Sequence, residues 1–145
     1  MAYDVVVGVD TSEASRRAVE LACRWHGSGL IRAVLLVHVV PWSPFSFQTP
    51  QDNELQHVHR EQEKDAAREQ VLQPLADLAR KFDVEPELIV RHGDGVHVLE
   101  EIAGEREDRM IIVGRTGDSG LRERLFGGLP AHLVKSSGVP VVVVP

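Results

Sequence analysis

Glycine and arginine are concentrated in one stretch near the end of the chain. The stretch follows a short apolar run, Met110–Val113, and precedes a segment of helical composition, residues 129–137. It contains Gly114, Gly117, Gly120, Gly127, Gly128, Arg115, Arg122 and Arg124. Glycine lets a ligand approach the main chain closely, and the first turn of a helix presents unpaired N–H groups and a positive dipole end. The stretch therefore suits a phosphate group, to whose oxygens guanidinium groups would add charge-assisted hydrogen bonds.

The glycines also have a simpler interpretation. A connection between a strand and a helix needs turns, and glycine supplies them without any ligand. Glycine patterns alone match many unrelated sequences. Composition therefore leaves both interpretations open.

The spacing of three glycines resembles a known family. Gly114, Gly117 and Gly127 stand in the arrangement G-x2-G-x9-G. With the opening residues 3–12, YDVVVGVDTS, and the closing valine run, the sequence is similar to the universal stress protein family along its whole length. The ATP-binding members carry Ser or Thr directly after the last motif glycine, where this chain has Gly128. The resemblance implies binding of ATP or a related adenine nucleotide, with or without Mg²⁺, by a small stress-response or signalling protein.

Length and composition indicate one ordinary globular domain. The chain has 145 residues, 43% hydrophobic and 26% charged, so we expect a single domain over residues 1–145. A net charge of −6 argues against nucleic-acid binding. The apolar runs are too short to cross a bilayer, no basic leader is visible, and the one cysteine, Cys23, excludes an intrachain disulfide. We expect a cytoplasmic protein with no membrane partner, in which Cys23 is a small buried hydrophobe.

The hydrophobic pattern predicts five strands separated by helices. The strands are expected at residues 5–9, 31–40, 84–90, 110–113 and 139–144. Residues 53–81 have a helical pattern that Pro74 interrupts, so we expect a kink or two abutting helices there. The apolar stripe of this segment comprises Val71, Leu72, Leu75, Leu78, Ala79 and Phe82. Pro86 either places the third strand near an edge of the sheet or restricts its pairing.

This alternation is typical of an α/β domain with an open parallel sheet and helices on both faces. The resemblance implies the strand order 3-2-1-4-5 of a Rossmann-like, adenine nucleotide alpha hydrolase-like fold. In that order the winding reverses between the first and fourth strands, and ligands bind beyond the carboxyl ends of the strands at such a point. Asp10 and Gly114 would then border one crevice.

The resemblance also implies roles for single residues. Asp10 would contact the nucleoside and the main chain of Val39 the adenine edge, while Gly114, Arg115, Gly117, Gly127 and Gly128 would surround the phosphates. Each role has an alternative. Asp10 would equally well cap the first helix, and Val39 would equally well be plain strand core. Pro130 removes one N–H donor from the last helix.

The last strand offers an apolar edge for pairing. Its residues are Val139, Val141, Val142, Val143 and Val144. Such an edge promotes aggregation unless it is covered, and members of the family commonly pair it across a two-fold axis. We expect a homodimer through this strand. The alternative is a monomer shielded by Pro140 and Pro145.

The remaining sequence signals are less informative about function. Seven histidines without a recognisable zinc set are interpreted as surface residues, with His38 a hydrogen-bonded strand residue and His92 and His97 without evident partners. The aromatic residues of segment 41–50 either cover a ligand or fix the segment to the core. We find no catalytic motif, so any ATP hydrolysis would be slow. A second hypothesis is a dimeric interaction module that does not bind nucleotides.

Overall fold

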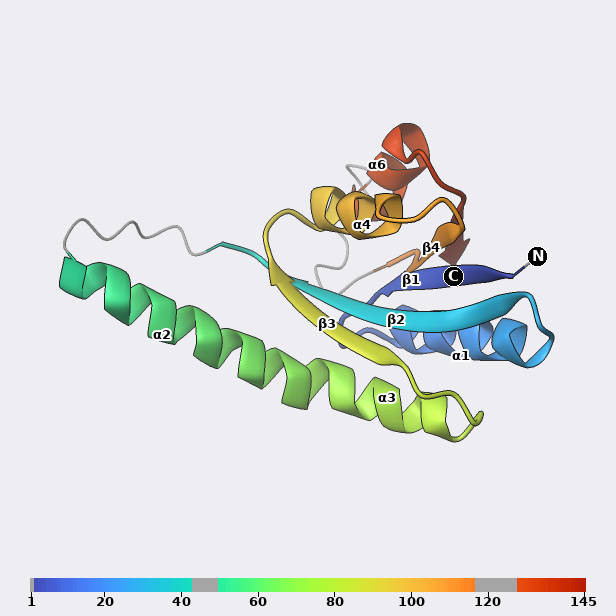
Figure 1. The fold of residues 1–145 in the computed structure, drawn as a ribbon, viewed down its shortest axis with the longest axis horizontal. Helices are drawn as coiled ribbons and strands as arrows, with labels where there is room; N and C mark the ends of the chain where they lie inside the picture. Colours follow the sequence, from blue (N-terminus) through green and yellow to red (C-terminus); the bar gives the residue numbers. More distant parts are fainter. Residues whose placement is uncertain (1, 43–49, 117–127) are drawn as a thin grey trace.

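Runs of valine and isoleucine form the strands of a parallel sheet. The structure, a computed structural model, describes residues 2–42, 50–116 and 128–145. Its strands are β1 (Tyr3–Gly8), β2 (Ile31–Val40), β3 (Glu87–His92), β4 (Arg109–Gly114) and β5 (Val141–Val144). They pair in the order β3-β2-β1-β4-β5 within one five-stranded sheet (Figure 1). The predicted α/β class and the order 3-2-1-4-5 are confirmed.

Two strands begin later than the hydrophobic pattern predicts. β3 starts at Glu87 rather than at Val84, and β5 starts at Val141 rather than at Val139. In each case the strand begins directly after a proline, which has no N–H for the ladder. β3 is an edge strand, as the position of Pro86 indicated.

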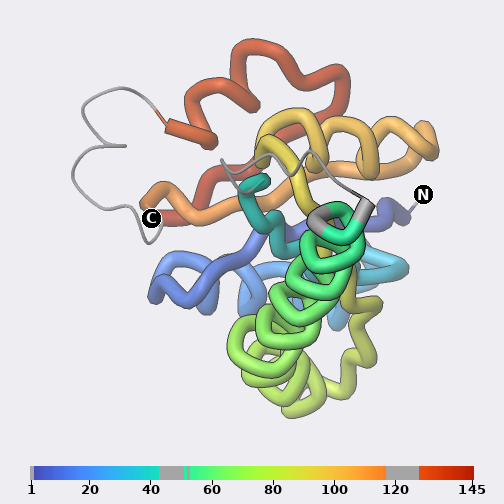
Figure 2. The backbone as a smooth tube through the Cα atoms, turned by 90° about the vertical axis from the view of Figure 1, so that its left-hand side faces the viewer, coloured from blue at the N-terminus to red at the C-terminus, as the bar shows by residue number. Residues whose placement is uncertain are grey.

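Helices cover both faces of the sheet. They are α1 (Glu13–Gly27), α2 (Pro50–Ala67), the π-helical turn η1 (Arg68–Leu72), α3 (Gln73–Arg80), α4 (Gly95–Gly104) and α6 (Gly128–Ser136). Because side chains alternate along a strand, Val5 and Val7 pack into one core with α1 and α3, and Val6 packs into a second core with α4 and α6. Figure 2 shows the two layers on opposite sides of the strands.

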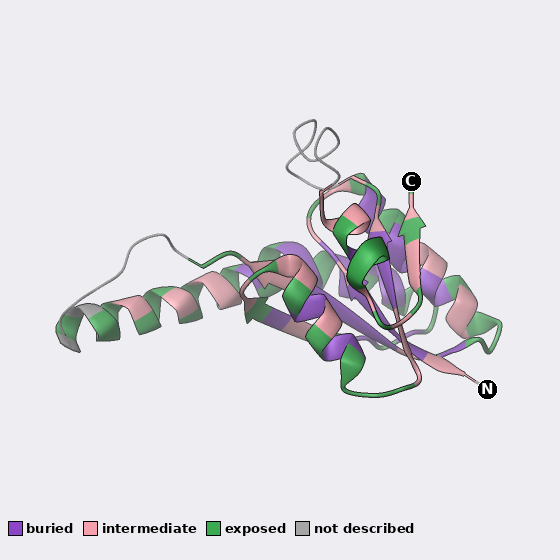
Figure 3. Ribbon diagram, turned by 90° about the horizontal axis from the view of Figure 1, so that it is seen from above, coloured by how far each residue is buried: buried purple, intermediate pink, exposed green. Residues whose placement is uncertain are grey.

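The interruption predicted at Pro74 takes the form of η1. The backbone N–H of Gln73 donates to the carbonyl of Arg68, five residues earlier, so the chain passes from α2 into α3 through one wide turn. In the predicted apolar stripe, Phe82 is 37% exposed, and its assignment to the core is wrong because it lies beyond the end of α3. Most of α2 extends beyond the sheet (Figure 3). No helix in the described ranges is long and apolar enough to span a bilayer.

Cys23 faces the core from α1. Its side chain is buried, which confirms the prediction of a small buried hydrophobe. Burial raises the pKa of the thiol to about 11, and the charge of Glu20 adds to the shift. The thiol is therefore protonated and unreactive at neutral pH.

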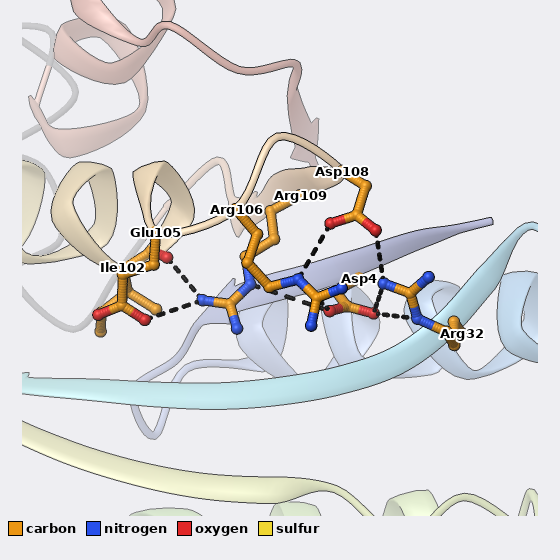
Figure 4. A network of polar contacts seen from close by, with 7 residues as sticks. All are labelled: Asp4, Arg32, Ile102, Glu105, Arg106, Asp108 and Arg109. Atoms are coloured by element: carbon orange, nitrogen blue, oxygen red, sulfur yellow. Dashed lines mark hydrogen bonds and ion pairs between the residues drawn. The ribbon is translucent and has the colours of Figure 1, made fainter. Parts of the chain in front are cut away.

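A cluster of charged side chains closes the amino ends of the strands (Figure 4). Asp4, 4% exposed, accepts a 3.0 Å hydrogen bond from Nε of Arg32, whose Nη2 lies 2.6 Å from Asp108. Nε of Arg106 donates to the other oxygen of Asp108 at 3.2 Å. Arg109 lies 3.9 Å from Asp4. The hydrogen bond from Arg32 holds the pKa of Asp108 below its ordinary value, and Arg106 acts in the same direction.

Candidate functional site

A cavity of about 450 Å³ lies at the carboxyl ends of β1, β2 and β4. It sits where the winding of the sheet reverses, between β1 and β4. Asp10, Val39, Gly114 and Gly128 all line it, so the structure brings four of the sequence-predicted site residues together. Gly117 and Gly127 lie outside the described residues.

Asp10 lies directly beyond β1 and holds the turn into α1. Its Oδ1 accepts hydrogen bonds from the backbone N–H of Ser12 and from the hydroxyl of Ser15, both at 2.8 Å. The N-cap of α1 is Ser12, whose hydroxyl accepts from the N–H of Ser15 at 3.2 Å. Asp10 is therefore not the cap itself. Its carboxylate is oriented by two donors at the edge of the cavity.

The β2 wall is formed by His38 and Val39. Nδ1 of His38 donates to the carbonyl of Val9 at 2.7 Å, because a carbonyl oxygen can only accept. This bond joins the end of β2 to the segment that leads to Asp10. His38 is thus a hydrogen-bonded strand residue, as the sequence indicated. Val39 is half-buried and packs against the core beneath α4 and α6.

Gly114 is required by packing. A Cβ atom at this position would lie 2.6 Å from the Cβ of Ala14 and 3.0 Å from its carbonyl carbon. The start of α1 therefore approaches β4 closely, which only glycine permits. This close approach keeps the beginning of α1 next to the cavity.

Gly128 serves a different purpose. Its φ of 42° lies in the left-handed region, which disfavours residues with a side chain. It begins α6, whose first turn borders the cavity through Leu129 and Pro130. Glycine at this position thus has a conformational reason that is independent of any ligand.

Arg115 is not among the residues that line the cavity, although its neighbours Gly114 and Thr116 are. Its backbone N–H donates to the carbonyl of Val144 at 2.6 Å and so extends the pairing of β4 with β5. Its side chain is exposed. The prediction that Arg115 contacts phosphate therefore depends on the guanidinium group alone.

The sequence analysis missed one wall of the cavity. Gly93, Asp94 and Gly95 line it from the end of β3, and His132 lines it from α6. Asp94 is the N-cap of α4 and accepts from the N–H of His97 at 3.1 Å. The available signal was the topology: a Gly-Asp-Gly turn after a parallel strand lies at the same edge as the other strand ends.

Metal-ligating side chains do not gather in the described part of the structure. Within residues 2–42, 50–116 and 128–145, no three His, Cys, Asp or Glu side chains are placed so as to hold a metal ion. The described polar groups of the cavity are carboxylates, imidazoles, the hydroxyls of Ser15 and Thr116, and main-chain groups. Such a lining is suited to hydrogen bonding with a polar organic ligand.

Comparison with known proteins identifies the family. The model of the "Universal stress protein family" matches residues 1–145. This chain belongs to the universal stress protein family. No curated protein matches the sequence significantly.

This universal stress protein shares its fold with several solved structures. A universal stress protein in complex with cAMP is 24% identical and has a TM-score of 0.65. The match covers 100% of this chain and 98% of that protein. UspA from Lactobacillus plantarum is 20% identical, covers 100% and 99% of the two chains, and has a TM-score of 0.68. An Arabidopsis thaliana family protein with AMP bound is 20% identical, covers 98% and 90%, and has a TM-score of 0.63. At these identities the likeness shows the fold.

Proposed function

We propose that this universal stress protein binds ATP or a related adenine nucleotide in the cavity between β1 and β4. The observation that carries the proposal is the meeting of Asp10, Val39, Gly114 and Gly128 at one cavity. Its volume of about 450 Å³ is within the range of small-molecule sites. Two proteins of the same fold have cAMP and AMP bound, which supports an adenine nucleotide as the class of ligand.

The proposed orientation follows the chemistry of the walls. The nucleoside lies toward Asp10, whose carboxylate accepts hydrogen bonds from hydroxyl groups, and toward the main chain of Val39. The phosphates lie toward Gly114, Gly128 and the N-terminus of α6, whose dipole favours negative charge. We propose that Gly117, Gly127 and the side chain of Arg115 also contact the phosphates, as the glycine spacing implies. Mg²⁺ would enter with the phosphates.

A second candidate has a specific observation in its favour. Gly128 supplies no hydroxyl and Pro130 supplies no N–H, so the start of α6 has fewer donors than a phosphate-binding helix usually offers. These residues favour a dimeric interaction module that has the family fold without a nucleotide. Under either candidate we place the protein in the cytoplasm, in a stress-response or signalling role.

Nucleotide analysis of the purified protein separates the two candidates. Small molecules released by denaturation are identified by mass spectrometry, and ATP, AMP and cAMP are titrated by calorimetry with and without Mg²⁺. We expect micromolar binding of at least one of them, weakened by Asp10→Asn. Asp83→Asn, at an exposed position after α3, is the matched control. Absence of both bound and titratable nucleotide would support the interaction module.

We also propose a homodimer through β5. This strand is at the edge of the sheet, and the Val143 side chain is 36% exposed. Pairing two copies of an apolar edge strand covers both edges at once. Val142→Asp and Val143→Asp are expected to give monomers by light scattering, whereas Val134→Asp, on the exposed face of α6, leaves the mass unchanged. A dimer that survives both β5 variants refutes the proposed interface.

A further inference from the structure

The side of α2 that faces the sheet is polar. Its half-buried residues include Gln56, Arg60 and Glu63, which recur at helical spacing up to the buried Ala67. A helix packed on a core normally presents an apolar stripe there. Polar contacts therefore join this side of α2 to its neighbours.

These contacts converge on the end of β3. The ring of His92 stacks on Trp42 with centroids 5.0 Å apart and an interplanar angle of 19°. The guanidinium carbon of Arg60 lies 5.4 Å from the centroid of Trp42. His92, Trp42 and α2 are thus joined through one aromatic contact surface, next to Gly93 and Pro41 of the cavity wall.

The polar edge of His92 is incompletely paired. Its side chain is 3% exposed, and Nε2 has no hydrogen-bond partner among the described residues. The nearest carboxylate oxygen recorded is Oε2 of Glu63, at 3.6 Å, beyond hydrogen-bond distance. The other oxygen of Glu63 lies 3.0 Å from Nε2 of His59. A buried nitrogen without a partner is unfavourable, and a small approach of α2 would correct it.

We propose that protonation of His92 closes this gap and latches α2 onto the sheet. The imidazolium donates from Nε2 to the Glu63 carboxylate, and a charge-assisted bond is shorter and stronger than the contact made by the neutral ring. In the described part of the chain, the charged groups that contact the cluster come from α2: Glu63 favours the proton on His92, whereas Arg60, protonated His59 and the burial of the ring oppose it. The aromatic contact from the end of β2 is Trp42, and residues 43–49 contain no titratable side chain.

The direction of the response follows from the two partners. The contact is charge-assisted only while Glu63 is ionised and His92 is protonated, so the latch closes on acidification.

Tryptophan fluorescence tests the proposal in the full chain. Trp42 becomes the only tryptophan in Trp25→Phe, which serves as the reference. A cation in contact with the indole alters its emission. We expect one reversible transition between about pH 8 and about pH 5, with a midpoint that Glu63→Gln lowers by about half a pH unit or more. His92→Phe keeps a stacking ring and abolishes the transition, whereas His59→Gln retains it.

Several results would overturn the latch. A transition that persists in His92→Phe, or a midpoint unmoved by Glu63→Gln, assigns the signal elsewhere. If His92→Phe does not fold by circular dichroism, the ring-proton shift of His92 in the reference protein supplies the titration. Amide protection factors of residues 55–67 are expected to rise about three-fold or more on acidification to about pH 5.5, and not in Glu63→Gln. Equal protection at both pH values refutes the closing of α2.

Discussion

The two ends of β1 and its neighbours place carboxylates in opposite surroundings. At the amino end, Asp4 and Asp108 face the guanidinium groups of Arg32, Arg106 and Arg109. At the carboxyl end, Asp10 and Asp94 accept hydrogen bonds from N–H and hydroxyl groups of the turns that begin α1 and α4. At the amino end, charged side chains thus neutralise one another. At the carboxyl end, local hydrogen bonds fix the turns that surround a cavity. The difference separates a closed structural end from an open binding end.

The largest effect is expected at the closed end. Asp4→Asn removes a charge that is 4% exposed and leaves Arg109, whose side chain is 11% exposed, with Glu105 as its remaining counter-ion. We expect the free energy of unfolding to fall by about 2 to 3 kcal/mol, less than for a fully buried pair because Arg32 and Arg106 reach solvent. Urea denaturation measures it. Glu85→Gln, in an exposed pair with Arg80, is the control, and equal losses in both variants would contradict a special role for the amino end.

At the open end, the first expected change comes from packing rather than charge. Gly114→Ala places a Cβ 2.6 Å from that of Ala14, so α1 must shift, and we expect destabilisation by about 2 kcal/mol. Gly27→Ala is the matched control, because nothing lies within 4 Å of its added methyl group. Thermal unfolding distinguishes the two. An unchanged midpoint for Gly114→Ala would mean that α1 does not depend on this close approach.

Gly128→Ser tests conformation against ligand chemistry at one position. A side chain at φ 42° is expected to cost about 1 kcal/mol of stability. The added hydroxyl is expected to raise ATP affinity about five-fold or more, since a hydrogen bond to a charged phosphate outweighs the strain. Calorimetry with ATP and Mg²⁺ provides the measurement, with Gly138→Ser as the control. Affinity that does not change would refute the idea that the missing hydroxyl weakens the site.

The smallest expected effect is the acid response of Asp108. Its pKa is lowered in the folded protein by the hydrogen bond from Arg32, so it contributes stability above the unfolded value of about 3.9. That contribution is lost as the pH falls through the still lower folded pKa. Asp108→Asn should therefore flatten the decline of unfolding free energy below about pH 4. A slope identical to that of the parent chain would remove Asp108 from the acid response.

Local patterns were sufficient to predict most of the fold. The β2 range Ile31–Val40 matches its apolar run, because a strand buried on both faces has no polar alternation to obscure its ends. β3 and β5 start later than predicted because the proline before each strand has no N–H for the ladder. Both prolines are visible in the sequence, but the hydrophobic pattern alone does not register a missing N–H. The strand order came from the family resemblance and not from periodicity.

The site was predictable where it follows a strand end and unpredictable where it depends on tertiary placement. Asp10 and Gly114 end neighbouring strands, so their meeting followed from the implied order. The expectation that His92 lacks a partner is wrong. Nε2 of His97 lies 3.6 Å from a carboxylate oxygen of Glu101, one helical turn away and beyond hydrogen-bond distance. His92 stacks on Trp42, a contact between two strand ends that neither local sequence specifies.

The π-helical turn sets the rotational phase of a helix. Positions that face the sheet, Glu63, Ala67, Val71, Leu75 and Ala79, recur every fourth residue across η1. In an unbroken α-helix that interval would turn the stripe by about 40° at each step. The wider turn offsets part of this drift, so that the polar stripe of α2 and the apolar stripe of α3 face the same sheet. One extra residue in the helix therefore decides that Glu63 faces His92 rather than solvent.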